Sequence, residues 1–518
     1  MIRGFAMADN LGLDIISVGL WHGMLPPALA AMEHSLDILP LSPREEDDFR
    51  AFIAAGWQLR PGTDLNWKNA QDHNGAEKIE PGLVARHPGG GLVILRNRLV
   101  LQLNPTLSPA RIADFRQRYA QAWPLEFGKN LFEVELKLPE YDLQGAVRQE
   151  LDFMNANPDV VFCEPSLVYH LTPPGRIMDG SIDSFDQWQW DNIHLEDAWA
   201  VAGKGKGIRV AVIDYGFHDD SDILPTAWTA ALDKEGNPQE TLRPSSHGTF
   251  CAGLVGGHLG DLAVNGAAPE CDLAFIGVPK EGVMSQVALA KALMLCAKGP
   301  SGNNGADVIS CSLGWGSKWT LSPELKMAID CVHEVGRPDG DLNRGAVIVW
   351  AVFNSEEEIL SSSVEGYDGL LAVAQCNSAD ARVVSGYGLA LDLIAPGYKV
   401  RGIRWQGKVR GIGEGEGSSL AAPCVAGVAA LVLAANPNLT WRQVAEVLTQ
   451  SCDRLGKAVP DLPDRYIGWG RLDAKAAVEK AKDLLPVAST APPALRPVRG
   501  RRSNTAKSAK RTGRPRRR

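Results

Sequence analysis

Residues 417–423 read Gly417-Ser418-Ser419-Leu420-Ala421-Ala422-Pro423, and they open a run of small apolar residues that extends to Ala435. The pattern predicts a helix with Ser419 in its first turn. The first backbone N–H groups of a helix lack intrahelical partners and lie at the positive end of its dipole, so they favour negative charge. This position suits a serine nucleophile, although a serine that only caps a helix gives the same local pattern.

A histidine base for Ser419 must precede it in the chain, because the last histidine is His333. This order excludes the α/β-hydrolase arrangement, in which the serine comes before the acid and the histidine. A glycine-rich loop is expected at residues 411–417, and its G-x-G-x-G-x-G spacing differs from the G-x-G-x-x-G of dinucleotide sites. Among ten histidines, His247 stands out, because Ser246, Gly248 and Thr249 surround it with small side chains.

The candidate acid is Asp214, which ends the apolar strand pattern 208–213 and is followed by Tyr215-Gly216. Sites in open parallel sheets lie at the carboxyl ends of strands. Each of these three residues has a structural explanation when it is taken alone. Together they give the order Asp214, His247, Ser419, which separates the subtilisin arrangement from the chymotrypsin arrangement.

The three motifs resemble those of the subtilisin-like (S8) serine protease family. Asp214-Tyr215-Gly216 resembles D-[ST]-G, residues 246–249 resemble H-G-T, and residues 417–423 resemble G-T-S-M-A-x-P. The resemblance implies a serine endopeptidase acting on polypeptides, with Asp214, His247 and Ser419 as its triad and no cofactor for catalysis. Structural calcium is frequent in the family, but no ligands are assigned here, and an inactive homologue that binds peptides is the alternative.

Further residues are implied by the same resemblance. Asn354 follows the strand pattern 346–352 and matches the oxyanion-hole asparagine of A-x-G-N, except that Phe353 replaces glycine and puts the wall of the specificity pocket in question. Ser312, Leu313 and Gly314 resemble the strand end along which substrate binds.

Periodicity divides the chain into four parts. Strand and helix patterns alternate over 185–485 and predict a three-layer α/β domain with a mostly parallel sheet. Residues 92–170 predict a small α+β unit of order β-α-β-β-α-β. Its end, 157–165, resembles the family's inhibitory propeptide, which implies an intramolecular chaperone and inhibitor with a cleavable link between Tyr169 and Phe185.

Residues 1–90 show no recognisable chemistry, although helices are predicted over 28–36 and 44–55, and Pro88-Gly89-Gly90-Gly91 resembles a linker. The tail 486–518 should be disordered, and eleven Lys or Arg with no Asp or Glu fall within 496–518. Such a tail either keeps the protein soluble or binds nucleic acid in a salt-dependent way.

The composition of the chain indicates the cellular compartment in which it works. The nine cysteines form no C-x-x-C pair, which indicates buried free thiols and a reducing environment. The longest apolar run, 421–435, is shorter than the roughly 18–20 residues of a membrane span. Because the N-terminus also lacks a recognisable export signal, the sequence favours a cytoplasmic protein over a secreted one. It also predicts no membrane helix.

Overall fold

The computed structural model describes residues 14–15, 42–55, 57–59, 64–71, 77–87, 91–137, 143–171, 175–178, 187–218, 224, 226–259, 264–279, 282–300, 304–314, 319–339, 342–406, 409–458 and 461–485. The chain divides into two units, Met1–Leu484 and Leu485–Arg518. The helix predicted over 28–36 and the tail predicted to be disordered lie outside the described residues.

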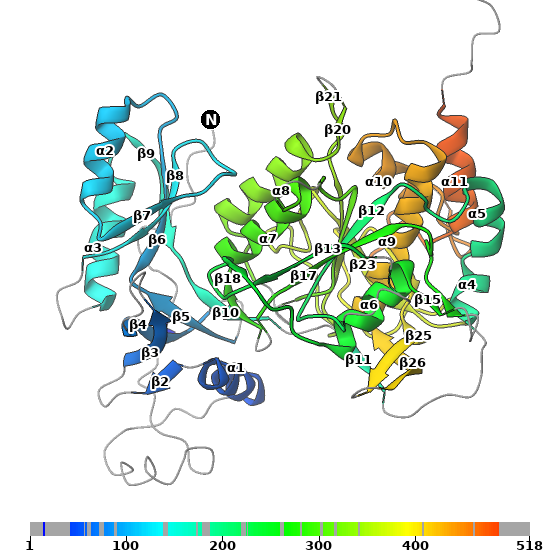
Figure 1. Ribbon diagram of the computed structural model, residues 1–518, viewed down its shortest axis with the longest axis horizontal. Coiled ribbons are helices and arrows are strands. Elements are labelled where there is room, and N and C mark those ends of the chain that lie inside the picture. Colours follow the sequence, from blue (N-terminus) through cyan, green and yellow to red (C-terminus); the bar gives the residue numbers. More distant parts are fainter. Residues whose placement is uncertain are drawn as a thin grey trace, which may run out of the picture. The chain divides into compact units, whose positions relative to one another are not determined.

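An eight-stranded sheet forms the centre of the large α/β domain (Figure 1). Its strands are parallel except for the antiparallel edge strand β14. In spatial order they are β14 (Pro238–Gln239), β13 (Thr226–Leu232), β17 (Asp272–Gly277), β12 (Arg209–Asp214), β19 (Val308–Cys311), β22 (Val347–Ala351), β23 (Leu371–Cys376) and β24 (Leu393–Pro396).

Helices cover both faces of this sheet and confirm the predicted three-layer architecture. Alternate residues of β12 enter opposite cores: Val210 and Val212 face one core, while Ala211 and Ile213 face the other. The helices on the first side are α5 (Leu195–Ala202), α6 (Ser246–Gly256), α9 (Ser418–Ala435), α10 (Trp441–Gln450) and α11 (Ala474–Asp483); those on the second are α7 (Gln286–Lys298) and α8 (Pro323–Val335).

Helix α9 is the central helix of the first layer. Among the described residues it is the one helix long and apolar enough to cross a membrane by length and composition, but 89% of its apolar window is buried inside the fold. A core helix passes the same test, so its composition reflects packing on β22 and β23.

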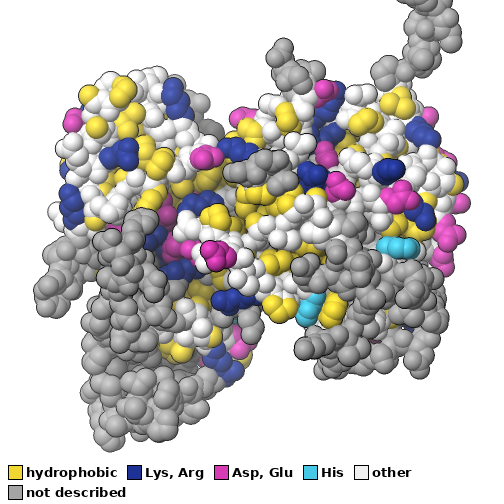
Figure 2. All heavy atoms as spheres, viewed as in Figure 1, with side chains coloured by type: hydrophobic (Ala, Val, Ile, Leu, Met, Phe, Trp, Pro, Cys, Tyr) yellow, Lys and Arg dark blue, Asp and Glu magenta, His cyan; other side chains and the backbone are white. Residues whose placement is uncertain are grey.

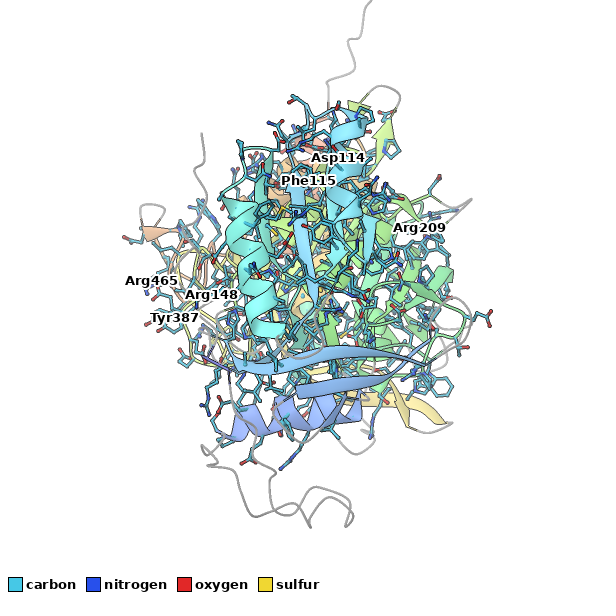
Figure 3. The ribbon with its side chains drawn as sticks, turned by 90° about the vertical axis from the view of Figure 1, so that its left-hand side faces the viewer. Asp114, Phe115, Arg148, Arg209, Tyr387 and Arg465 are labelled. Carbon is cyan, nitrogen blue, oxygen red and sulfur yellow. The ribbon has the colours of Figure 1, made fainter. Side chains whose placement is uncertain are left out.

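The small α+β unit is an antiparallel sheet of order β7-β8-β6-β9, with two helices packed on it (Figures 1 and 3). Its own core contains Phe115 and Val147 from the helices and Leu101 from the central strand. The elements are β6 (Arg98–Leu103), α2 (Pro109–Gln117), β7 (Gln121–Pro124), β8 (Leu131–Glu135), α3 (Leu143–Asn155) and β9 (Val160–Pro165), in the predicted order.

A second antiparallel sheet joins the N-terminal region to the large domain. Its order is β18-β10-β5-β4-β3-β2, with β1 beside β4. The elements are β1 (Asp14–Ile15), β2 (Trp57–Leu59), β3 (Asp64–Gln71), β4 (Glu77–Arg86), β5 (Leu92–Arg96), β10 (Val168–His170) and β18 (Val283–Ser285). Strands β4 and β5 pair antiparallel on either side of the predicted linker, of which residues 88–90 lie outside the described residues.

Helix α1 (Pro43–Ala54) closes this sheet and agrees with the helix predicted over 44–55. Its Asp48 is 2% exposed and accepts the backbone N–H of Leu92 at 2.8 Å, while its other oxygen lies 3.0 Å from His170 Nδ1. One buried carboxylate therefore holds β5 and β10 together.

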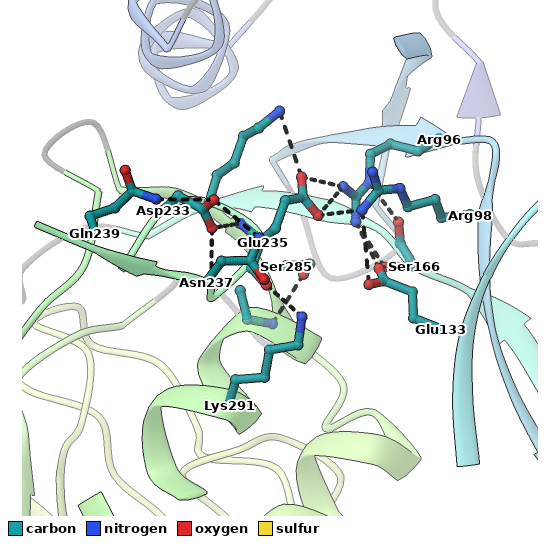
Figure 4. Close-up of polar contacts among 12 residues, drawn as sticks. Arg96, Arg98, Glu133, Ser166, Asp233, Glu235, Asn237, Gln239, Ser285 and Lys291 are labelled. Atoms are coloured by element: carbon teal, nitrogen blue, oxygen red, sulfur yellow. Dashed lines mark hydrogen bonds and ion pairs between the residues drawn. The ribbon is translucent and has the colours of Figure 1, made fainter. Parts of the chain in front are cut away.

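A buried ion network links the small unit to the large domain (Figure 4). Arg96, which is 0% exposed, donates to both carboxylate oxygens of Glu235 at 2.8 Å, and Arg98 donates to Glu235 at 2.7 Å. Arg96 also donates to Ser166 Oγ at 2.9 Å and lies 3.3 Å from Glu133. Glu235 belongs to the connection between β13 and β14, so both arginines are anchored to the large domain.

The remaining elements are short, apart from one hairpin near α9. They are α4 (Trp188–Asn192), β11 (Gly175–Ile177), β15 (His258–Leu259), β16 (Val264–Asn265), β20 (Pro338–Asp339), β21 (Leu342–Asn343), β25 (Tyr398–Gln406) and β26 (Val409–Gly417). Strand β26 contains the glycine-rich stretch that the sequence indicated as a loop; it pairs with β25 and β11 instead.

Two further features are the state of the cysteines and the distribution of charged side chains on the surface. All nine cysteines are free, and all except Cys331 are buried, as predicted. On the face drawn in Figure 2, the acidic and basic side chains of the described residues are intermingled.

Candidate active site

The three predicted residues converge although they are far apart in the sequence. Asp214 is the last residue of β12, His247 is the second residue of α6, and Ser419 is the second residue of α9. His247 Nδ1 lies 2.8 Å from Asp214 Oδ2, and His247 Nε2 lies 3.0 Å from Ser419 Oγ. With an ionised Asp214 as acceptor, Nδ1 carries the proton and Nε2 is the acceptor for the serine hydroxyl.

Small residues permit this approach. Ser245 caps α6 by accepting the N–H of Gly248 at 3.3 Å. A Cβ added at Gly248 would lie 2.1 Å from the carbonyl oxygen of Gly216 and 3.0 Å from Asp214 Cβ. Any side chain at this position would therefore push α6, and His247 with it, away from the end of β12.

Asp214 also determines the charge state of His247. Burial by itself lowers the pKa of His247, but the adjacent Asp214 carboxylate and Cys251 together outweigh burial and hold the pKa well above its ordinary value of 6.5. Asp214 is fully buried, and its second oxygen accepts the N–H of Tyr215 at 2.8 Å. The carboxylate is thus fixed in position by a backbone donor.

Pro423 explains the surroundings of the Ser419 carbonyl. Proline has no N–H, so in a helix the carbonyl four residues earlier loses its usual donor. That carbonyl is the one of Ser419, and it accepts Ser312 Oγ at 2.8 Å and Cys251 Sγ at 3.3 Å. Ser312, which was predicted to bind substrate, therefore donates a hydrogen bond to the backbone of the candidate nucleophile.

The other predicted substrate residues lie close by but inside the fold. Leu313 is fully buried in the core beside α7 and α8, and Gly314 is also buried. Asn354 follows β22, and its Oδ1 accepts the N–H of Ser418 at 3.0 Å, which orients the side-chain amide. The ring of Phe353 is 1% exposed and packs in the core against Gly386, so it does not project toward Ser419.

The described parts of the chain's own segment 168–178, residues 168–171 and 175–178, pair with two strands near Ser419. On one side β10 pairs antiparallel with β18, and the N–H of Leu171 donates to Gly282 at 2.7 Å. On the other side β11 pairs antiparallel with β26. Gly175, the first residue of β11, lies so close that an added Cβ would meet Ser419 Oγ at 2.1 Å.

Two residues that contact this segment were missed by sequence reasoning. The Tyr215 hydroxyl donates to the carbonyl of Leu171 at 2.6 Å, and Glu416 of β26 pairs with Arg176. Tyr215 departs from the D-[ST]-G motif, which was the available signal for a special role. Nothing in the sequence marked Glu416 or β18.

One group of three potential metal-ligating side chains occurs among the described residues, and it is Asp214, His247 and Cys251, whose ligand atoms lie within 4.8 Å of one another. Calcium takes about six to eight oxygen ligands. Imidazole nitrogen and thiol sulfur do not fit calcium, so this group assigns no ligands to the structural calcium that the family resemblance made possible.

Comparisons with known proteins point in one direction. Residues 205–470 match the subtilase family. A calcium-dependent protease of Trichormus variabilis is 29% identical over 334 residues, which are 56% of this chain and 48% of that protein. Subtilisin of Bacillus pumilus is 30% identical over 283 residues, which are 53% of this chain and 92% of that protein.

A solved protease from Pseudoalteromonas arctica aligns with a TM-score of 0.48 at 24% identity, covering 58% of this chain and 100% of that one. The chain spans about half the length of the calcium-dependent proteases that it matches.

Proposed function

Because the chain belongs to the subtilase family, we propose that it is a serine endopeptidase with Asp214, His247 and Ser419 as its catalytic triad. The observation that carries the proposal is the unbroken sequence of contacts from Asp214 through His247 to Ser419, at 2.8 Å and 3.0 Å. No other group of the fold needs to move for these three side chains to act together.

In this proposal Ser419 Oγ attacks the peptide carbonyl while His247 Nε2 takes its proton. Asp214 keeps the imidazole in the required tautomer and stabilises its charged form. His247 then protonates the leaving amine, and water hydrolyses the acyl-enzyme. The Asn354 amide and the Ser419 backbone N–H are proposed to stabilise the oxyanion.

The first substrate is proposed to be the chain itself. Strand β11 begins at Gly175 and is paired with β26, so it represents the leaving side, whereas β10 and Leu171 are held by β18 on the acyl side. Ser419 lies beside Gly175. These contacts favour cleavage of the Pro174–Gly175 bond, within the predicted interval between Tyr169 and Phe185.

The small α+β unit is proposed to act as an intramolecular chaperone and inhibitor. Its C-terminal strand β10 occupies the edge of β18 on which a substrate strand would add. It is also paired with β5 on its other edge, so cleavage alone leaves it held from both sides.

Two expectations remain proposals with indirect support. Relatives named calcium-dependent proteases favour a structural calcium in this chain, although its ligands are unassigned. The nine free cysteines favour a reducing, cytoplasmic compartment.

Labelling with a fluorophosphonate tests whether the protein is an enzyme or an inactive peptide-binding homologue. We expect a phosphonyl adduct on Ser419, because only a serine activated by a neighbouring base attacks the reagent at a useful rate. The adduct should vanish in His247→Ala. A protein that is neither labelled at Ser419 nor cut within its own chain would belong to the inactive class.

The pH profile of kcat/KM should reflect the raised pKa of His247. The base must be neutral to accept the serine proton, so activity is lost as the pH falls through this pKa. We expect the acidic midpoint above 6.5 for the wild type, because Asp214 raises the pKa. In Asp214→Asn the midpoint should move to lower pH, measured with a peptide substrate between about pH 5 and 9. An unchanged midpoint would contradict the assignment.

A further inference from the structure

We propose that Glu416 is a specificity-determining residue that favours peptides with an arginine at the second position after the cleaved bond. The inference rests on the proposed peptidase function and adds the substrate class to it. In the chain's own segment, Glu416 pairs with an arginine. We take this contact as an example of the side chain that the site recognises.

The contact is specific in register. Arg176 and Glu416 are directly opposite in the antiparallel pairing of β11 with β26, and their neighbours Gly175 and Ile177 pair with Gly417 and Gly415. Arg176 Nε and Nη2 both lie 2.7 Å from Glu416 Oε1. Such charge-assisted bonds are shorter and stronger than those between neutral groups.

The neighbours of Glu416 in the strand make it the selective position. Glycines on both sides, Gly415 and Gly417, offer no side chain to a bound peptide, so Glu416 supplies the contact at this point. The Glu416 side chain is 19% exposed, whereas Arg176 is 73% exposed. The acid is thus built into the sheet, while the arginine approaches it from solvent, as a side chain of a substrate would.

Chain direction assigns Glu416 to the leaving side. The segment runs from β10, held by β18, to β11, held by β26, and Gly175 at the start of β11 lies beside Ser419. A substrate bound in the same direction presents its first leaving residue where Gly175 lies and its second where Arg176 lies. In any peptide bound in this direction, Glu416 therefore contacts the residue that takes the place of Arg176.

The other acidic side chain on this part of β26 does not make the contact with Arg176. Glu414 lies two residues earlier on β26, but its partner in the strand pairing is Arg401 of β25, and its carbonyl accepts the N–H of Met178. Glu414 therefore offers a matched control: a carboxylate on the same strand that makes no pair with Arg176 among the contacts of the described residues.

Because the arginine is mostly exposed, the preference is moderate. Exposed ion pairs give factors of about 2–5 in an equilibrium, and like charges oppose binding by a similar factor. We expect kcat/KM for Arg to exceed that for Ala by about 2–5-fold, and that for Glu by about 5–20-fold.

The experiment uses internally quenched peptides spanning residues 171–178, with Arg, Ala or Glu at the position of Arg176. The self-processed full-length protein is assayed as wild type, as Glu416→Arg and as Glu414→Arg. The wild type should prefer Arg over Glu, Glu416→Arg should reverse the order to Glu over Arg, and Glu414→Arg should keep the wild-type order.

The outcomes distinguish the role of Glu416 from the peptidase function. Equal cleavage of the three peptides by the wild type overturns the role of Glu416 and leaves the peptidase function standing. The same loss of preference in Glu414→Arg and Glu416→Arg also overturns it, because general charge would then be the cause. Absence of both self-cleavage and peptide cleavage in the wild type, or equal cleavage of the peptides by Ser419→Ala, overturns the proposed function itself.

Discussion

Ser419→Ala should lower peptide hydrolysis by about 10⁶-fold while the protein stays folded. The magnitude is the loss in kcat measured for subtilisin when its serine nucleophile is removed, and we transfer it from that relative. The physical reason is local: without Oγ, the 3.0 Å contact with His247 Nε2 has no nucleophile to activate. The measurement is kcat/KM on a quenched peptide, with circular dichroism as the test of folding.

Ser418→Ala is the matched control for this variant. Ser418 is the adjacent residue of α9, but its hydroxyl donates to the Val352 carbonyl and not to His247. It should keep most of the activity and lose about 1 kcal/mol of stability, the usual value of a buried hydrogen bond. Equal losses in Ser418→Ala and Ser419→Ala would show that the helix terminus, rather than one hydroxyl, was disturbed.

Glu235→Ala should destabilise the intact chain by about 3–5 kcal/mol, because it leaves buried arginine charge without its main partner. Arg96 is 0% exposed and makes both its 2.8 Å contacts across the junction with Glu235. The effect is read from urea unfolding in the Ser419→Ala background, which keeps the chain in one piece. The free energy of unfolding should fall, and the small α+β unit should separate from the large domain first.

Glu126→Ala is the control for the same junction. Glu126 of the small unit pairs with Lys298 of α7 at 2.8 Å, but the pair is exposed, at 78% and 42%. An exposed pair contributes at most about 1 kcal/mol. A loss in Glu235→Ala no greater than in Glu126→Ala would contradict the view that the buried network anchors the unit.

The pH dependence of this anchor follows from the pKa of Glu235. Burial raises that pKa, but Arg96, Arg98 and Lys234 outweigh burial and hold it well below its ordinary value. A lowered pKa in the folded state gives stability that is complete above the ordinary carboxyl range of about 4.5 and is lost as the pH falls toward the folded value. The network therefore stays intact at neutral pH.

Much of the large domain could be predicted because its strands are buried on both faces. Largely apolar runs such as Val308–Cys311, which forms β19, indicate a strand with apolar contacts on both sides. The candidate triad was predictable for a related reason: each member ends a strand or begins a helix, where the local sequence is constrained.

The contacts of the segment 168–178 could not be predicted from the sequence. Pairing of β10 with β18 joins residues more than a hundred positions apart, and neither strand has a distinctive pattern. The glycines of β26 indicated a loop, since glycine weakens isolated strands. They are tolerated there because Gly413 and Gly415 sit against Arg404 and Leu420, where a side chain would not fit.

The junction between β5 and β6 could not be predicted for a similar reason. The chain passes from one sheet to another at Asn97, giving β5 and β6, and alternation of side chains alone does not reveal such a change. Arginine is usually a surface residue, and the burial of Arg96 depends on partners that are distant in the sequence, above all Glu235.

The most direct measurement is the intact mass of the purified protein, compared between wild type and Ser419→Ala. If the hydroxyl, the imidazole and the carboxylate act on the segment that lies across them, the wild type yields a fragment beginning at Gly175 and the variant stays whole. Identical masses for the two proteins, whether both are cut or both are whole, would contradict the account.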